Sequence, residues 1–333
     1  MPIITGRDEV LAVYAEAARR GWVIPCLCSE NLTTTEAILT AAEDFARDTG
    51  YTRIPVCLAI TNQYDHRSQS VYYTHTRRWD IGLALFRASI EILAPVFPAV
   101  DILIHLDHAQ YDHDAGLLAG DLGAYSSVMF DASALPLEEN IRLTRAFVEQ
   151  RGGELLIEGA CDEIVDATGE QRCEITDADK CERYVRETGV DLVVANLGTE
   201  HRASGQDLHY HDEAARAIRE RIGPRICLHG TSSVSQDQLG RLFEDGICKV
   251  NIWTALERDS APALTCWTVK NVARCAGPAT EQRLIDEGCL TPASRTGAAA
   301  SLEHFTTTAR QEIIFREMKR IARSYLDLWY RPA

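Results

Sequence analysis

Short apolar runs alternate with segments of helical periodicity along most of the chain. Eight runs have the length of a strand, and they cover residues 22–28, 54–60, 101–108, 127–131, 154–158, 191–197, 225–229 and 246–252. Several of these runs are almost continuously apolar rather than alternating. That pattern is typical of strands that are covered on both faces in a parallel sheet.

Six segments have the spacing of amphipathic helices, and they cover residues 7–20, 34–48, 136–150, 178–188, 235–245 and 301–328. Their ends carry recognisable signals. Thr33-Thr-Thr-Glu36 predicts a capped start for the second segment, and Gly50 follows its end. Pro136 and Asp177 open two further segments with residues that suit a first turn or a cap.

The regular alternation of strands and helices predicts an α/β fold of the (β/α)8 TIM barrel class with a C-terminal helical extension. We expect residues 1–255 to form the barrel core and residues 256–333 to form a helical extension of the same domain. A doubly wound sheet is the alternative, because strand order cannot be read from spacing. Residues 62–79 form a polar, aromatic insertion that would lie over the active-site face of a barrel.

Composition and charge narrow the range of partners. Of 333 residues, 46% are apolar and 25% charged, which is ordinary globular composition. The formal net charge of −15 argues against nucleic acid or an anionic membrane as a partner. The eleven cysteines show no repeating spacing, which favours a reducing compartment. Since no signal-peptide pattern and no run of about 20 apolar residues occurs, we expect a cytoplasmic protein.

Polar side chains stand at the ends of three predicted strands. The third strand ends in His105-Leu-Asp107-His108, the sixth is followed by His201 and the seventh ends in His229. In a barrel the carboxyl ends of all strands open on one face, and three imidazoles are a common ligand set for catalytic zinc. Each histidine taken alone is more often a packing or capping residue than a metal ligand. Together they predict a Zn2+ site with Asp107 as a proton carrier, while His105 is expected to pack inside the barrel.

Six short blocks follow one another along these strands and loops. They are His105–His108, Ser127–Ser133 with Leu135–Asn140, Thr176-Asp177 with Glu187–Asp191, Gly198–His201, Leu228–Gly230 and Lys249–Thr254. In this order they resemble the metal-dependent class II fructose-bisphosphate and tagatose-bisphosphate aldolases. The resemblance covers about residues 8–255 and is weakest at 60–100 and 160–175.

The resemblance implies a zinc-dependent aldehyde-lyase that makes or cleaves a carbon–carbon bond. His108, His201 and His229 match the family's three zinc ligands. Zinc would polarise a ketone carbonyl and stabilise the enediolate left by cleavage. Asp107 matches the carboxylate that exchanges a proton with the hydroxyl of the aldehyde-derived carbon, and Asn251 matches an asparagine that contacts the enediolate.

The pocket residues depart from the family pattern. Six residues are assigned to substrate binding because they stand at positions of the family's motifs: Thr61, Arg202, Gly230, Ser232, Trp253 and Thr254. Thr61 stands in place of a serine, and Arg202 replaces a glycine after the sixth-strand histidine. Trp253 occupies a position that is usually acidic or an amide. The substrate is therefore expected to be a ketose, with or without phosphate, or a related hydroxy-ketone bound in an altered phosphate pocket.

The carboxylates around the fifth strand also differ from the family's. The usual Glu-x-Glu is Glu158-Gly-Ala160, so one alternative metal ligand is lost. Glu158 is either close to the metal or a buried partner of a base. The following loop lacks the acid motif of the family, and Asp162, Glu163 or Asp166 could supply the proton-abstracting group, with Glu163 preferred.

Two other functions are compatible with the same residues. One is a non-catalytic metal-binding barrel. This alternative is favoured by the altered loop and by Ala160, which stands where the family has an acidic residue. The other is a different metal-assisted enolisation, such as that of an epimerase or decarboxylase. The family likeness also predicts a homodimer or homotetramer.

Overall fold

The strands of the protein close into a single parallel barrel. The computed structural model describes residues 2–163, 175–199, 210–231 and 234–330. The strands are β1 (Ile24–Cys28), β2 (Ile54–Thr61), β3 (Val100–Gln110), β4 (Ser127–Asp131), β5 (Leu156–Ala160), β6 (Leu192–Val194), β7 (Ile226–Leu228) and β8 (Ile247–Ile252). They pair in sequence order, and β8 pairs with β1. The predicted (β/α)8 barrel is confirmed, and the doubly wound alternative is wrong.

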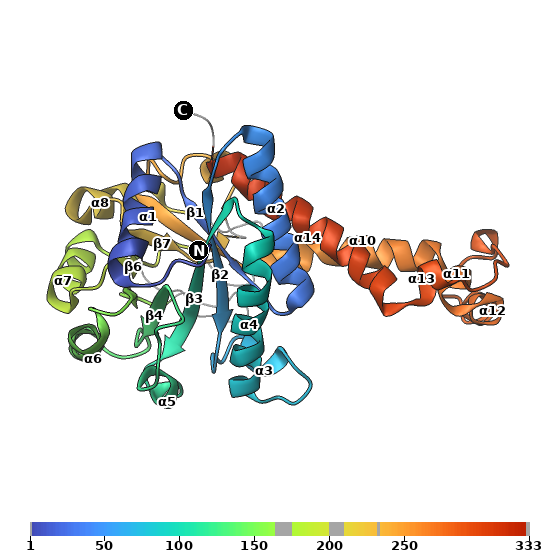
Figure 1. Cartoon of the computed structure of the whole chain (residues 1–333), viewed down its shortest axis with the longest axis horizontal. Coiled ribbons are helices and arrows are strands. Elements are labelled where there is room, and N and C mark those ends of the chain that lie inside the picture. Colours follow the sequence, from blue (N-terminus) through green and yellow to red (C-terminus); the bar gives the residue numbers. More distant parts are fainter. Residues whose placement is uncertain (1, 164–174, 200–209, 232–233, 331–333) are drawn as a thin grey trace.

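Helices surround the barrel (Figure 1). They are α1 (Arg7–Arg20), α2 (Leu32–Thr49), α3 (Gln69–Tyr72), α4 (Trp79–Leu93), α5 (Ala115–Leu118), α6 (Leu137–Arg151), α7 (Ala178–Thr188), α8 (Asp212–Ile222) and α9 (Gln236–Leu239). Helix α2 begins earlier than the capped start predicted at Thr33. Its cap is Asn31, whose side chain accepts a hydrogen bond from Thr34 N. Asp177 caps α7 as predicted. The helix predicted over 235–245 is limited to the four residues of α9.

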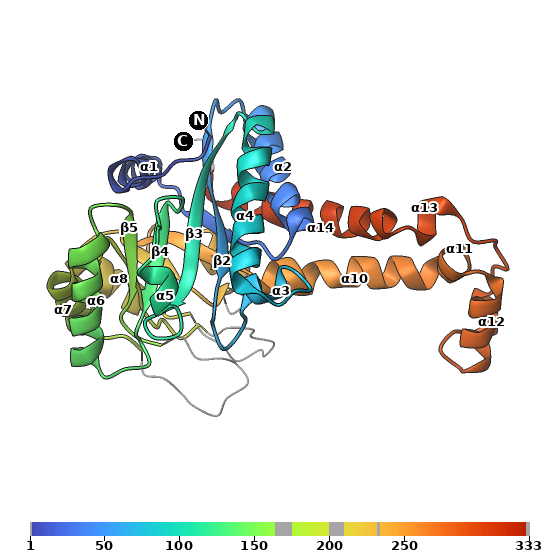
Figure 2. The same ribbon diagram turned by 60° about the horizontal axis from the view of Figure 1, so that its bottom comes forward.

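The C-terminal helices form an arm that projects from the barrel and returns to it (Figures 1 and 2). They are α10 (Thr254–Lys270), α11 (Val272–Ala276), α12 (Pro278–Asp286), α13 (Leu302–Phe305) and α14 (Thr307–Trp329). The predicted helix 301–328 is interrupted at Thr306, whose extended backbone and side chain cap α14. At the barrel, α14 packs on α2, and Tyr330 Oη donates to Pro55 O at 2.7 Å.

The barrel strands form the centre of one continuous apolar core. All residues of β1, β2, β4, β5 and β8 are buried. Cys26, Cys57 and Cys227 are buried with them, and none of the cysteines in the described part of the chain forms a disulfide. No helix within the described residues has both the length and the apolar character needed to cross a membrane.

The predicted 62–79 insertion contains α3, which packs closely on α4. Gly82 makes this approach possible, since a Cβ there would overlap the carbonyl oxygen of Ser70. Because Ser70 Oγ also donates to Asn62 Oδ1 at 2.5 Å, the same contact fixes the beginning of the insertion at the end of β2.

We predict that Gly82→Ala lowers the free energy of unfolding by about 1–3 kcal/mol, because the added methyl forces two backbones apart. Urea denaturation followed by circular dichroism measures this loss. Gly116→Ala is the matched control, because no atom lies within 4 Å of its would-be Cβ. Equal stability of the two variants would show that α3 does not need this contact.

Candidate metal and catalytic site

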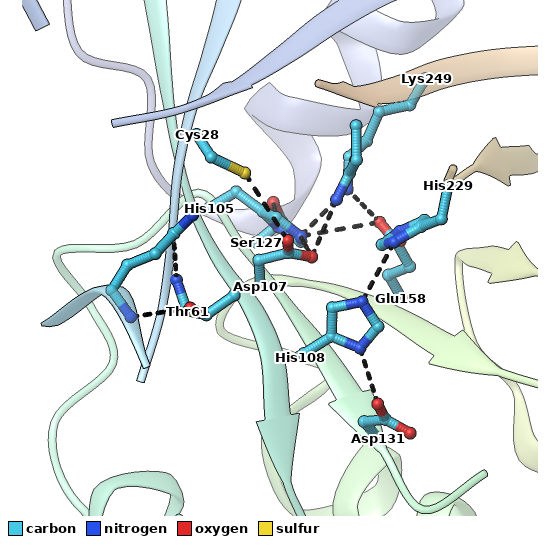
Figure 3. A network of polar contacts seen from close by, with 12 residues as sticks. Cys28, Thr61, His105, Asp107, His108, Ser127, Asp131, Glu158, His229 and Lys249 are labelled. Carbon is cyan, nitrogen blue, oxygen red and sulfur yellow. Dashed lines mark hydrogen bonds and ion pairs between the residues drawn. The ribbon is translucent and has the colours of Figure 1, made fainter. Parts of the chain in front are cut away.

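An irregularity in β3 brings two consecutive side chains to the same site. The pairing of β3 with β4 shifts between Leu106 and Ala109, and His108 has φ 45°, in the left-handed region. In a regular strand, Asp107 and His108 would point to opposite faces. With the bulge, both side chains face the interior of the carboxyl end (Figure 3). Such backbone strain costs on the order of 1–3 kcal/mol and is typical of functional sites.

Two imidazoles face each other across the end of the barrel. His108 Nε2 lies 3.1 Å from His229 Nδ1, and both side chains are buried. The remaining ring nitrogens face carboxylates. His108 Nδ1 lies 2.7 Å from Asp131 Oδ2, and His229 Nε2 lies 3.5 Å from Glu158 Oε1. Each carboxylate favours a hydrogen on the nitrogen next to it, so the two facing nitrogens are the ones that could bind a metal ion.

This donor set fits a metal ion. Asp107, His108 and His229 offer ligand atoms that all lie within 4.8 Å of one another. Two nitrogens on one tetrahedral zinc, at bond lengths of about 2.0–2.1 Å, are about 3.3 Å apart, close to the distance found here. A carboxylate behind each histidine is the usual support of a metal ligand. The third predicted ligand, His201, lies outside the described residues.

Asp107 is buried and held from several sides. Asn251 Nδ2 donates to its Oδ1 at 2.8 Å, and the Cys28 thiol lies 3.8 Å from its Oδ2. Burial alone would raise the pKa of Asp107, but the neighbouring His108 and His105 outweigh burial and lower that pKa well below its usual value. The lowered pKa keeps Asp107 in its ionised carboxylate form.

A charged network fills the barrel directly beneath the site. Lys249 Nζ donates to Glu158 Oε2 at 2.5 Å and lies 3.0 Å from His105 Nε2, and all three side chains are fully buried. Burial would lower the pKa of Lys249, but the charge of Glu158 outweighs it and raises that pKa. His105 packs inside the barrel as expected, where its Nδ1 lies 2.8 Å from Ser127 Oγ. Glu158 contacts both a base and a candidate metal ligand, so the two alternatives for it are not exclusive.

One cavity brings together the predicted catalytic residues and the predicted substrate-binding residues. It encloses about 630 Å³ including its open mouth. The predicted site residues that line it are Asp107, His108, His229, Asn251, Thr61, Gly230, Trp253 and Thr254. Arg202 and Ser232 lie outside the described residues.

The start of the 62–79 insertion forms part of the cavity wall. Tyr64 stacks on the imidazole of His108, with ring centroids 4.1 Å apart and an interplanar angle of 5°. The hydroxyl of Thr61 donates to the carbonyl oxygen of Arg67 and accepts from Gln69 N. Thr61 therefore uses its hydroxyl to hold this loop in place, and its predicted contact with substrate stays a prediction.

Glu163 lines a different cavity from the one that contains Asp107. That second cavity, of about 530 Å³, is bordered by Glu163, Tyr64, His108 and Asp131. Asp162, another of the loop acids, is occupied by an ion pair with Lys180 and a hydrogen bond from Thr176. Asp166 lies outside the described residues. The catalytic role of Glu163 therefore stays a prediction.

Sequence reasoning assigned no role to several residues that shape the site. Asp131 is an acid at a strand end, and Lys249 is a lysine within an apolar strand. Both features could have identified these residues as part of the site. Tyr64 and the pair Glu30–Arg67 gave no comparable signal, because their partners are distant in sequence.

The barrel and the facing imidazoles define a TIM-barrel protein with a candidate metal site. Residues 8–310 match the family described as fructose-bisphosphate aldolase class-II. The chain therefore belongs to the class II fructose-bisphosphate aldolase family. Family membership and fold together support an aldolase-type lyase.

Individual relatives agree with this assignment. A fructose-bisphosphate aldolase of Giardia intestinalis is 30% identical over a match that covers 50% of this chain and 59% of that relative. A fructose-bisphosphate aldolase of Treponema pallidum is 26% identical over 72% of this chain and 80% of its own length.

Solved structures show the same fold at low identity. A fructose-bisphosphate aldolase from Campylobacter jejuni has a TM-score of 0.77 at 16% identity, covering 98% of this chain and 95% of its own. The YdjI aldolase from Escherichia coli K12 has a TM-score of 0.63 at 18% identity, covering 96% and 95%.

We predict that Asp131→Asn weakens zinc binding by roughly 10–100-fold, because His108 loses the carboxylate that orients its ring. Titration against a chelator of known affinity measures the change. Asp8→Asn, at an exposed carboxylate, is the control. Unchanged zinc affinity in Asp131→Asn would mean that His108 is not a ligand.

Lys249→Met should lower the free energy of unfolding by about 3–5 kcal/mol, because it leaves the charge of Glu158 buried without its partner. Replacing both members, as Lys249→Met with Glu158→Gln, should recover part of this loss. Urea denaturation of the two variants makes the comparison. If the single and double variants lose equal stability, charge compensation is not what the pair provides.

Proposed function

We propose that the protein is a zinc-dependent class II aldolase-type lyase that makes or cleaves a carbon–carbon bond in a ketose, a ketose phosphate or a related hydroxy-ketone. The observation that carries the proposal is the pair of facing nitrogens on His108 and His229 beside the carboxylate of Asp107. His201 is proposed as the third ligand. The Zn2+, when bound, supplies Lewis-acid polarisation of the ketone carbonyl.

Asp107 carries the proton. In the cleavage direction, its carboxylate removes the hydroxyl proton from the aldehyde-derived carbon as the carbon–carbon bond breaks. The electron pair of that bond stays with the ketone-derived fragment, and the former hydroxyl becomes the aldehyde carbonyl. Asn251 holds Asp107 through its amide and is proposed to contact the ketone-derived fragment. A loop acid, with Glu163 preferred, then protonates the carbon.

The phosphate pocket around these groups is proposed to differ from that of the family. Gly230, with φ 68°, lets the backbone approach a ligand, and Thr254 begins α10, so the two are proposed to contact the ketone end. Ser232 and Arg202 are proposed to complete that region. We further propose a cytoplasmic homodimer or homotetramer with a small-molecule substrate.

A different metal-assisted enolisation would use the same groups, and so would a barrel that only binds metal. The 3.1 Å between His108 Nε2 and His229 Nδ1 also suits a hydrogen bond between the two rings in the absence of an ion. Metal analysis together with proton exchange on dihydroxyacetone phosphate separates the non-catalytic barrel from an aldolase, and product analysis separates an epimerase or decarboxylase from an aldolase.

We predict that zinc-loaded protein exchanges the carbon-bound protons of dihydroxyacetone phosphate with solvent, and that His229→Ala abolishes both zinc binding and this exchange. Exchange requires the metal and a base but no aldehyde partner. Proton NMR in deuterated water follows it, with metal content measured on the same samples. His113→Ala, at a half-exposed histidine outside the cavity, is the control. Exchange that persists without metal would refute the proposal.

A further inference from the structure

We propose that the cavity selects an aldehyde partner that carries no phosphate and has an apolar or aromatic tail. This inference rests on the proposed lyase function and specifies its substrate class. It follows from a cluster of Glu30, Arg67, Trp253 and Glu257, here called the Glu30 cluster. Arg67 and Trp253 line the cavity, Glu30 bonds to both of them, and the charges of Glu30 and Arg67 act on Glu257.

Glu30 holds Trp253 in one orientation. The indole Nε1 of Trp253 donates to Glu30 Oε1 at 2.7 Å, and Trp253 lies directly before α10. Because its only polar atom is satisfied by Glu30, the indole has no hydrogen bond to offer a ligand and presents apolar ring surface to the cavity that it lines.

Glu30 also neutralises Arg67. The guanidinium donates from Nε to Glu30 Oε1 at 2.9 Å and from Nη2 to Glu30 Oε2 at 2.5 Å, a bidentate pair. Its carbon Cζ stands 4.6 Å from the ring centre of Tyr72. Among the described residues, Arg67 is the only arginine or lysine that lines this cavity, so the described wall has no uncompensated permanent cation for a phosphate.

Glu257 makes the surroundings still less suitable for an anion. Burial, and after it the charge of Glu30, raises the pKa of Glu257 to about 7. Its Oε1 is buried without a hydrogen-bond partner. With Arg67 compensated by Glu30, any ionisation of Glu257 gives the cluster a net negative charge, and a phosphate dianion beside it would be repelled.

Much of the remaining surface that lines the cavity is apolar. Ile252, Ala255, Tyr64 and Cys28 line the same space, and burial keeps the Cys28 thiol protonated by raising its pKa. Apolar and aromatic side chains stabilise a bound tail by removing its apolar surface from water, while Asp107 and the imidazoles fix the reacting end. A planar or aliphatic aldehyde tail therefore suits this wall.

The test compares aldehydes in condensation with dihydroxyacetone phosphate, catalysed by the zinc-loaded full chain. We expect kcat/KM for phenylacetaldehyde to exceed that for glyceraldehyde 3-phosphate by roughly tenfold or more, about 1.4 kcal/mol in activation free energy. Succinic semialdehyde tests whether Arg67 recognises a carboxylate tail instead. Preference for either anionic aldehyde, or no preference, overturns the inference.

Variants locate the source of the preference. Trp253→Ala should lower kcat/KM for phenylacetaldehyde more than for glycolaldehyde, which has no tail, whereas Trp267→Ala on the arm should not change this ratio. Glu30→Gln should raise the relative rate with glyceraldehyde 3-phosphate, because it frees the charge of Arg67. An equal loss for both neutral aldehydes in Trp253→Ala would contradict the assignment.

Proton exchange on dihydroxyacetone phosphate tests the proposed lyase function separately from the proposed class of aldehyde. If the wild-type protein exchanges protons but prefers a phosphorylated aldehyde, the lyase function stands and the substrate class is wrong. If zinc-loaded protein exchanges no protons, the proposed function fails and this inference fails with it.

Discussion

The ion pair between Lys249 and Glu158 is the constraint on which the site depends. Two opposite charges lie inside a barrel of apolar strands, where either one alone would be costly to bury. Glu158 divides its two oxygens between Lys249 and His229, while Lys249 also faces His105. The pair therefore links the barrel interior to a candidate metal ligand. Side chains from β3, β5 and β8 and from the residue that follows β7 keep fixed relative positions.

The bulge in β3 has a complementary role. It lets Asp107 and His108 act at one point although they are neighbours in sequence. Asp131 on β4 holds the ring of His108 from below, and Tyr64 covers one face of that ring. His108 is thus fixed in orientation by a carboxylate and in position by an aromatic plane, which restricts the imidazole to the direction of His229.

The sequence was sufficient for the barrel and for the convergence of His108 and His229 because both follow from periodic patterns. Apolar runs reveal strands, and parallel strands bring their carboxyl ends together wherever they lie in the chain. The cap at Asn31 and the break at Thr306 depend on single backbone conformations that periodicity does not report. The Glu30–Arg67 pair could not be predicted either, since it joins two loops whose approach is set only by the folded barrel.

The proposed catalytic residues and the Glu30 cluster come from different kinds of element. Asp107, His108, Glu158 and Asn251 stand on strands, where changes would disturb the buried ion pair and the core. The Glu30 cluster lies on loops and at a helix start, with Arg67 in the insertion and Trp253 directly before α10. Changes there can alter the charge and shape of the wall without moving the strands. Under the proposed function, that separation lets the proton-transfer residues keep their positions on the strands while the pocket accepts a different aldehyde.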